Sequence, residues 1–289
     1  MMTKSTLLHL RIPFSFYLMP VFFLAIAVAE VEILQWEILQ VFFILHLLLY
    51  PASNGYNSYF DKDEGPIGGL KKPPKVEKQL YRLALWLDII AIVWSVILSL
   101  DFAMMILVYG LVSKAYSHPL IRLKKYPVAS WLTIGVFQGL FTAWMIWVGI
   151  GAGNINLIQE SIYWQAGSLA MVLLLGSYPM TQIYQHDEDQ KRGDLTLSLL
   201  LGVKGTFHFT ALFFLFAMAG FFLFFKMYFG LQYAVIFIVT LTPVLLFFCW
   251  WYLGILKGTQ QVSYQRTMQL NLISSICLSG FFLGMILFS

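Results

Sequence analysis

The chain has 289 residues, of which 60% are hydrophobic and only 11% are charged. Soluble domains carry about 25% charged residues, so this composition excludes an ordinary soluble globular protein and predicts a polytopic membrane protein. The net charge of +4 comes from basic residues scattered along the chain, and we expect no nucleic-acid partner. We predict an all-α helix bundle in which residues 1–289 form a single membrane domain.

Apolar runs that are long enough to cross a bilayer as helices, about 20 residues each, follow one another along the chain. We predict nine spans, near residues 12–30, 34–53, 80–100, 102–117, 129–151, 162–184, 206–228, 231–254 and 269–288. Asp101 marks a tight turn between the third and the fourth. Cys249 and Cys277 both lie in apolar runs, which argues against a disulfide framework.

The basic residues between these runs test the count independently. With the N-terminus on the cytoplasmic side, all but one of the 18 Lys and Arg residues fall in cytoplasmic segments, and the exception is Lys226. This asymmetry is the one that the positive-inside rule requires, and an error in the number of spans would destroy it. We therefore predict a multi-pass protein of the inner (plasma) membrane with its polar loops in the cytoplasm.

The first polar cluster follows the second apolar run, in the stretch NGYNSYFDKDEGPIGGLKKPP that begins at Asn54. Asn54, Asn57 and Asp61 stand at i, i+3 and i+7, so a helix that continues past the run places them on one face. Polar side chains at a membrane interface are costly unless they pair with a ligand, a metal ion or water. Asp63 and Glu64 follow directly.

The second polar cluster, YQHDEDQKRGD, follows the sixth run, at residues 184–194. Gln185 and Asp189 stand at i and i+4, again on one helical face. Both clusters lie on the predicted cytoplasmic side, and we predict that they form one site.

Two opposed stripes of oxygen donors suit Mg²⁺, a hard ion that takes a few carboxylates and completes its shell with water and phosphate oxygens. The five histidines are too scattered to indicate a zinc site. Lysines and arginines beside each cluster suit a polyphosphate. The alternative interpretation is that each cluster is a solvated loop between helices.

These residues resemble the UbiA-type intramembrane prenyltransferases, a family of nine-helix proteins. NGYNSYFD supplies Asn54, Asn57 and Asp61 of the family's first motif, and DQKRGDLTL supplies Asp189, Gly193 and Thr196 of its second. The basic segment YSHPLIRLKKYP after the fourth run also looks like the family's inner loop. The sequence departs from the family pattern at Gly65 and Gln185, where acidic residues are usual, and at Gln190, where an arginine is usual.

The resemblance implies Mg²⁺-dependent transfer of a prenyl group from an isoprenyl pyrophosphate to a lipophilic acceptor, an aromatic ring or a quinone precursor, within the bilayer. It implies catalytic roles for Asn57, Asp61 and Asp189. The same three residues would bind the metal, with Asp63, Glu64 or Gln185 completing the shell. The expected substrate-binding residues are Asn54, Lys71, Lys72, Lys114, Tyr116, Arg122, Lys124, Lys125 and Lys191.

Two polar residues lie inside predicted spans. Asp88 is an intramembrane carboxylate, which is costly and often functional, and a role in acceptor binding or proton transfer stays open beside a structural one. For His46 we expect a hydrogen bond between helices. Two other functions stay open for the whole chain: a transporter, although its charges gather at one end of the bundle, and a non-catalytic protein that binds isoprenoids.

Overall fold

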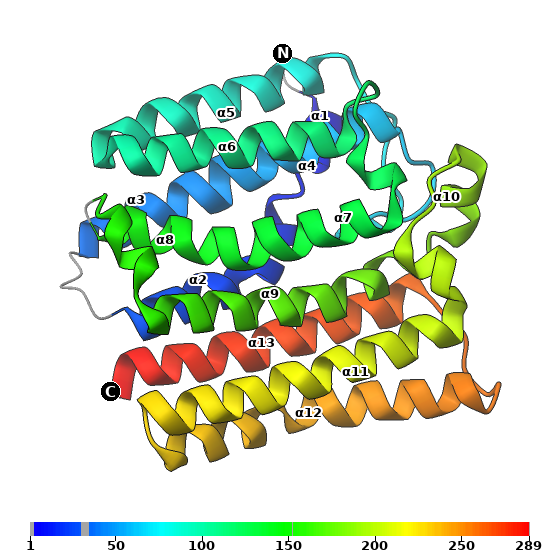
Figure 1. Cartoon of the computed structure of the whole chain (residues 1–289). Helices are drawn as coiled ribbons and strands as arrows, with labels where there is room; N and C mark the ends of the chain where they lie inside the picture. Colours follow the sequence, from blue (N-terminus) through cyan, green and yellow to red (C-terminus); the bar gives the residue numbers. More distant parts are fainter. Residues whose placement is uncertain (1–2, 30–34, 152, 289) are drawn as a thin grey trace.

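The computed structural model describes residues 3–29, 35–151 and 153–288, and nearly all of them are helical (Figure 1). The expected end of the first span at residue 30 and start of the second at residue 34 lie outside the described residues. The helices are α1 (Lys4–His9), η1 (Ile12–Leu18), α2 (Met19–Val28), α3 (Gln35–Phe43), η2 (Ile44–Leu49), α4 (Tyr50–Asp61), α5 (Gln79–Leu98), α6 (Leu100–Ser117), η3 (Leu123–Lys125), α7 (Pro127–Ile134), η4 (Gly135–Phe141), α8 (Thr142–Ile150), η5 (Ile155–Gln159), α9 (Ser161–Gln182), α10 (His186–Arg192), α11 (Leu197–Tyr228), α12 (Leu231–Leu256) and α13 (Tyr264–Phe288).

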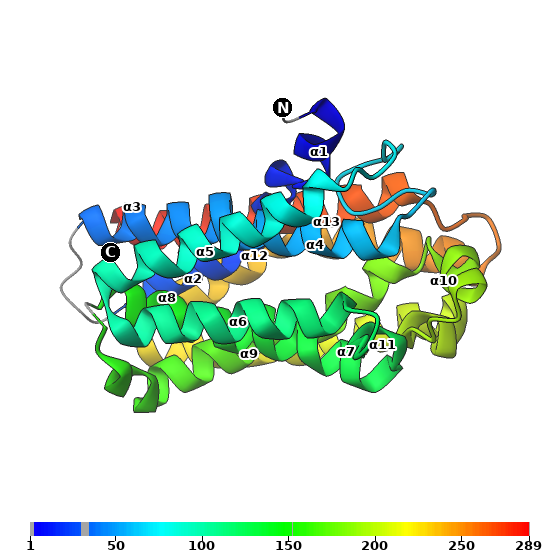
Figure 2. The same ribbon diagram turned by 90° about the horizontal axis from the view of Figure 1, so that it is seen from above.

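The long helices run side by side, and the polar connections gather at one end of the bundle. In both views, α10, the loop after α4 and the loop between α6 and α7 lie at the same end (Figures 1 and 2). Three segments far apart in the sequence therefore meet there. The outer faces of the bundle are apolar: Trp86, Val93 and Ile97 on α5 are each more than half exposed, as expected for side chains that face lipid.

Eight helical segments of the described chain are long and apolar enough to cross a membrane, and a ninth span is the pair α9 and α10 if the bend between them is counted as part of one span. The predicted fold, a membrane bundle of about nine helices, is confirmed. The turn between the third and fourth spans is at Ser99 rather than at Asp101, because Ser99 has extended backbone angles and its side chain caps α6 by accepting a hydrogen bond from the Phe102 N–H.

Two spans contain a π-helical turn, which the sequence did not predict. The second span passes from α3 through η2 into α4, and the fifth passes from α7 through η4 into α8. A third span, α11, has a kink at Gly202, whose φ of +67° is in the left-handed region that glycine tolerates. Helical turns of the π type are rare and frequently occur at functional sites, so η2 and η4 are candidate elements of such a site.

Candidate active site

The first polar cluster lies on the last two turns of α4. The helix continues after η2 with Pro51 in its first turn, where proline is tolerated, and it ends at Lys62, which has a left-handed φ of 51°. Asn54, Asn57 and Asp61 are therefore helical residues on one face, as the spacing predicted. Asn57 Oδ1 is buried and accepts no hydrogen bond from any described residue.

The second cluster lies on α10, which turns away from α9 by 82°. Gly193 ends α10 with a φ of 74°, and this glycine lets the chain reverse so that Thr196 can begin α11. Thr196 caps α11 by accepting from the Leu199 N–H at 3.3 Å, and its hydroxyl donates to Asp189 Oδ2 at 3.4 Å. Asp189 is thus held against the start of the next span.

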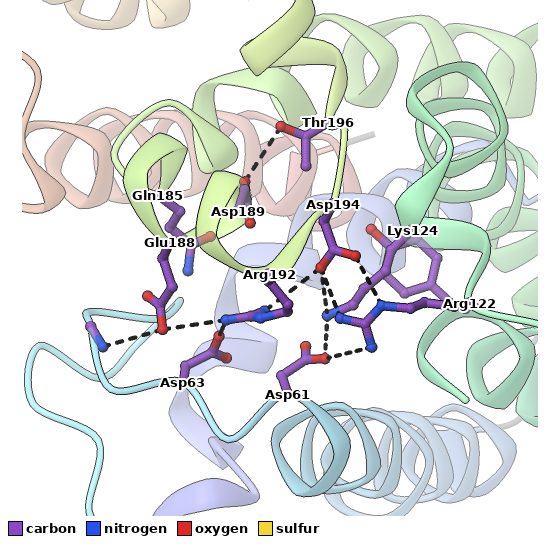
Figure 3. Close-up of polar contacts among 12 residues, drawn as sticks. Asp61, Asp63, Arg122, Lys124, Gln185, Glu188, Asp189, Arg192, Asp194 and Thr196 are labelled. Atoms are coloured by element: carbon purple, nitrogen blue, oxygen red, sulfur yellow. Dashed lines mark hydrogen bonds and ion pairs between the residues drawn. The ribbon is translucent and has the colours of Figure 1, made fainter. Parts of the chain in front are cut away.

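Direct contacts join the two clusters (Figure 3). The Arg192 guanidinium pairs with Asp63 and lies 3.3 Å from Glu188 Oε1. Glu188 Oε1 also accepts hydrogen bonds from the backbone N–H groups of Glu64 and Gly65, at 3.0 and 3.4 Å. The carboxylate of Glu188 therefore fixes the loop after α4 to α10.

The loop between α6 and α7 supplies the remaining charges. Arg122, with a left-handed φ of 46°, donates two hydrogen bonds to Asp194, Nε to Oδ1 at 2.9 Å and Nη2 to Oδ2 at 2.8 Å. Lys124 forms an ion pair with Asp61 and lies 3.9 Å from Asp194. Figure 3 shows these groups around one centre, with Asp61 on one side and Asp189 on the other.

Burial and charge set the protonation of this centre. Burial raises the pKa of the Asp189 carboxyl to about 7, even though Arg192 and Lys124 oppose the shift. Lys124 and Arg192 each interact electrostatically with both Asp61 and Asp189. The hydrogen bonds to Asp194 raise the pKa of Arg122 above its ordinary value, so this guanidinium stays charged.

One cavity adjoins this centre, and a second begins further along α4. A polar cavity of about 470 Å³ is lined by residues that include Asp61, Glu64, Gln185, Glu188 and Lys191. A second cavity, the apolar chamber, has a volume of about 200 Å³ and extends into the bundle from Asn54 and Tyr178 to Phe282. Of the described residues that line the apolar chamber, none is charged.

The model of the UbiA prenyltransferase family matches residues 17–274. The chain belongs to the UbiA prenyltransferase family. The prediction made from the paired motifs is thereby confirmed, and with it the predicted enzyme class, a prenyltransferase. No curated protein matches the sequence.

Solved structures share the UbiA fold. The apo structure of a UbiA homolog from Aeropyrum pernix K1 has a TM-score of 0.74 at 16% identity, covering 94% of this chain and 98% of that one. A UbiA homolog from Archaeoglobus fulgidus bound to DMAPP and Mg²⁺ has a TM-score of 0.68 at 13% identity, covering 99% and 100%. A digeranylgeranylglyceryl phosphate synthase has a TM-score of 0.60 at 17% identity, covering 98% of each. At these identities the likeness shows the fold.

The UbiA site brings together several residues that the sequence predicted. Asp61, Asp63, Arg122 and Lys124 lie in the ion-pair network, and Asp189 is within electrostatic range of Arg192 and Lys124. Lys191, Gln185 and Glu64 line the polar cavity, and Asn54 lines the apolar chamber. Tyr116 lies within electrostatic range of Asp61 and Asp189, and its hydroxyl forms a hydrogen bond with the Tyr178 hydroxyl.

Four predicted lysines lie elsewhere. Lys71, Lys72 and Lys125 are exposed, and none of them is among the described residues that line either cavity. Lys114 forms an ion pair with Asp88 in the wall of the bundle, and its ammonium lies 5.2 Å from the centre of the Tyr56 ring. Gln185 lies in the second cluster as expected, but its side-chain amide donates to the Pro66 carbonyl at 3.0 Å, so it also helps to hold the first loop.

The structure adds residues that sequence reasoning missed. Glu188, Arg192 and Asp194 belong to the same ion-pair network. Arg11, buried between η1 and α4, donates to Asn54 Oδ1 at 3.1 Å and to the Gly68 carbonyl at 3.2 Å. Asp194 stands inside the quoted second motif, so the motif was a usable signal for it. For Arg11 the sequence held no signal, because its partners are contributed by distant segments.

The oxygen donors of the site suit Mg²⁺ only together with further ligands. No group of three or more Asp, Glu, His or Cys side chains among the described residues is close enough to hold a metal ion by itself. The unpartnered Asn57 Oδ1, together with Asp61 and Asp189, still fits an ion that takes few protein ligands and fills its shell with water and phosphate oxygens. These residues therefore fit a magnesium ion that arrives with a phosphorylated ligand.

Proposed function

We propose that this protein transfers a prenyl group from an isoprenyl pyrophosphate to a lipophilic acceptor, an aromatic ring or quinone precursor, within the bilayer, in a reaction that depends on Mg²⁺. The observation that carries the proposal is the position of α4. Its Asp61 lines the polar cavity, while its Asn54 lines the apolar chamber. An isoprenyl pyrophosphate has a charged head that suits the polar cavity and a hydrocarbon tail that suits the apolar chamber.

Asn57, Asp61 and Asp189 would hold the metal at the pyrophosphate, and Lys124, Arg122, Arg192 and Lys191 would contact its oxygens. Bound Mg²⁺ would supply charge stabilisation for the leaving pyrophosphate. The allylic C–O bond breaks and its electron pair stays on the pyrophosphate. Preorganised cations act where this negative charge develops, so they lower the barrier rather than only the ground state.

The allylic cation forms at the mouth of the apolar chamber, where water is excluded. Tyr50, Tyr109 and Tyr178 line this space, and aromatic faces attract cations. An electron-rich atom of the acceptor donates the electron pair of the new bond, and the proton that it loses passes to a pyrophosphate oxygen.

The ion pairs of the ligand-free site have a consequence for binding. Lys124 is neutralised by Asp61, and Arg192 by Asp63. A metal ion alone would compete with these cations, and a pyrophosphate alone would compete with these carboxylates. Together they let each charge exchange its partner, so metal and donor would bind cooperatively.

The orientation of the protein is part of the proposal. The excess of lysine and arginine in alternate loops supports a position in the plasma membrane with the polar end facing the cytoplasm. Water-soluble donors with short chains and membrane-bound donors with long ones would both reach the polar cavity from that side.

Release of pyrophosphate from farnesyl or geranylgeranyl pyrophosphate by the purified protein, with and without Mg²⁺, tests the proposal. We expect release that requires the metal and a prenylated product when a lipid extract supplies the acceptor. Asp61→Ala and Asp189→Ala should both abolish it. Unchanged rates in these two variants would remove the site from consideration, and binding of the donor without release would indicate an isoprenoid-binding protein.

A further inference from the structure

Several polar side chains line the apolar chamber, including Thr181 on α9 and Asn271 on α13, and one group of them gathers at a corner. Four residues that line it, Tyr50, Ser53, Tyr109 and Gln138, come from α4, α6 and η4. The rings of Tyr50 and Tyr109 lie 6.0 Å apart, and the Tyr109 hydroxyl interacts with the Gln138 amide. These residues form the polar corner.

The opposite wall of the chamber is hydrocarbon. The residues that α11 and α12 contribute to the lining are all apolar: Phe214, Met218, Phe221, Leu241, Val244 and Leu245. A prenyl chain gains most by lying against this wall, because burial of apolar surface drives its binding. The polar corner gives a hydrocarbon chain nothing to bond with.

Two hydroxyl groups of the polar corner are incompletely hydrogen-bonded. Tyr50 is 3% exposed, and neither its hydroxyl nor the Ser53 Oγ makes a hydrogen bond of normal geometry with a described residue. The Thr142 hydroxyl donates to the Phe137 carbonyl and can accept from the Tyr50 hydroxyl, although not with normal geometry, whereas Ser53 Oγ has no partner among the described residues. A buried polar group without a partner costs about 1–3 kcal/mol, so Ser53, together with the weakly bonded Tyr50, indicates a ligand that completes both.

Backbone geometry points to the same place. Tyr50 directly follows the π-helical turn η2, and Gln138 lies within the π-helical turn η4. His46 of η2 packs behind Tyr50, with ring centres 5.0 Å apart, and its nitrogens make no hydrogen bond of normal geometry within the described chain. His46 interacts with the backbone of Ser15 in η1, so the contact between helical segments expected for His46 is present without the geometry of a normal hydrogen bond. Its ring also supports Tyr50.

The polar corner is also correctly placed relative to the donor. Tyr50, Ser53 and Asn57 stand at i, i+3 and i+7 on one face of α4, with Asp61 one turn further. At about 1.5 Å per residue, Ser53 lies roughly 6 Å along the axis from Asn57 and 12 Å from Asp61. A ring bound at Ser53 and Tyr50 would therefore lie beside the first carbon of a prenyl chain whose pyrophosphate is at Asn57 and Asp61.

We infer that the polar corner binds the acceptor, and that the acceptor is an uncharged ring bearing hydroxyl or carbonyl oxygens. The inference rests on the proposed function. The ring oxygens complete the hydrogen bonds of Tyr50 and Ser53, and the same oxygens enrich the ring in electrons for attack on the allylic cation. A carboxylated or phosphorylated acceptor does not fit this corner, because no described residue that lines the chamber carries a charge.

Tyr50→Phe and Ser53→Ala test the inference, with Thr181→Val as the matched control. Thr181 lines the same chamber, but its hydroxyl already donates to the Tyr178 carbonyl at 2.7 Å. The measurements are equilibrium binding of a neutral dihydroxynaphthalene and of its carboxylated counterpart to the protein in nanodiscs, the KM for farnesyl pyrophosphate, and the melting temperature.

We expect each of the two variants to weaken binding of the neutral probe about three- to tenfold, the loss of one hydrogen bond. The KM for farnesyl pyrophosphate should stay unchanged in both variants, and the control Thr181→Val should bind the neutral probe as the wild-type protein does. The melting temperature of Tyr50→Phe and Ser53→Ala should stay equal or rise, because an incompletely bonded buried hydroxyl has been removed. A lower melting temperature would show a structural role and overturn the inference.

Absence of neutral-probe binding by the wild-type protein, unchanged binding in both variants, or preference for the carboxylated probe would each overturn it as well. Failure of the proposed function gives a different result. The protein would then release no pyrophosphate with Mg²⁺, whatever the probe does.

Discussion

Two buried aspartate–lysine pairs lie in this protein, and their surroundings differ. Asp61 pairs with Lys124 at the polar end, and Asp88 pairs with Lys114 between α5 and α6. The side chains of Asp61 and Asp88 are 5% and 8% exposed, and those of Lys124 and Lys114 are 10% and 19% exposed, so both pairs lie largely out of solvent. The first pair has Arg122 and Asp194 as alternative partners and the polar cavity beside it. The second pair lies against the Tyr56 ring, and neither Asp88 nor Lys114 is among the described residues that line the two cavities.

Burial of a charge does not by itself make a functional site. Asp61 and Lys124 can each exchange partners within a network that adjoins open space, so a charged ligand can enter. Asp88 and Lys114 have no such exchange, and their pairing holds two adjacent helices in register. The role in acceptor binding or proton transfer that the sequence left open for Asp88 stays a prediction: its Oδ1 is buried and accepts no hydrogen bond from a described residue, but Asp88 does not line either cavity.

The largest expected effect is on enzyme activity, which should depend strongly on Asp61 and little on Asp88. Asp61→Asn removes a metal ligand, and we expect the rate of pyrophosphate release to fall about 100- to 1,000-fold, as for loss of one electrostatic catalytic group. Asp88→Asn should change the rate less than about threefold. Steady-state assays of both variants in the same nanodiscs check this, and equal losses would erase the distinction.

The second expected effect is on the stability of the fold, to which the pair of Asp88 and Lys114 should contribute. Asp88→Leu alone leaves the Lys114 ammonium buried without its partner, and breaking a buried pair costs about 3–5 kcal/mol. Adding Lys114→Met should recover most of this loss, because an apolar pair of similar volume is often as stable. Thermal unfolding of the single and double variants measures the recovery. A double variant as unstable as Asp88→Leu alone would contradict the interpretation.

The third effect compares buried with exposed lysines. Lys124→Ala should raise the donor KM about tenfold or more, because Lys124 lies beside Asp61 in the network. Lys72→Ala and Lys125→Ala should change it less than about twofold, because exposed charges contribute little. Measurement of the donor KM in the three variants tests this expectation. A large increase in the KM of Lys72→Ala would show that the loop containing Lys72 closes over the substrate.

The smallest effect concerns pH. Because burial raises the pKa of Asp189 from its ordinary value to about 7, the folded protein binds this proton more tightly than the unfolded chain does. Its contribution to the stability of the ligand-free protein is therefore greatest in acid and is lost as pH rises toward 7. The melting temperature of the wild-type protein should fall by a few degrees more than that of Asp189→Asn between pH 5 and 7.5. If the melting temperatures of the two proteins changed in parallel with pH, the pKa of Asp189 would have its ordinary value.

Much of this architecture could be predicted from the sequence, because it rests on composition and spacing. The apolar runs predict the spans, and the spacing of Asn54, Asn57 and Asp61 predicts one helical face. The ion pairs could not be predicted. Arg122 reaches Asp194 only because the loops around them take left-handed turns at Arg122 and Gly193, and residue types do not specify those paths.

The positions of Lys71 and Lys72 could not be predicted for a similar reason. Lys71 and Lys72 belong to a loop whose later residues are bound by the N-terminal segment: the Ser5 hydroxyl donates to the Lys75 carbonyl, and His9 Nε2 hydrogen-bonds with the Pro74 carbonyl at 2.7 Å. The π-helical turns also lack a sequence signal, since neither HLLL nor GVFQGLF breaks the apolar pattern.

Gly65 has a consequence for how this sequence can diverge. A Cβ atom at position 65 would lie 2.6 Å from Glu188 Oε2. The space for a side chain there is already filled by a carboxylate from 123 residues along the chain. An acidic residue at 65 and the present position of Glu188 therefore exclude each other. A related sequence with an acidic residue at position 65 is expected to lack Glu188. Gly65→Asp should therefore destabilise the protein less when it is combined with Glu188→Gly than when it is made alone.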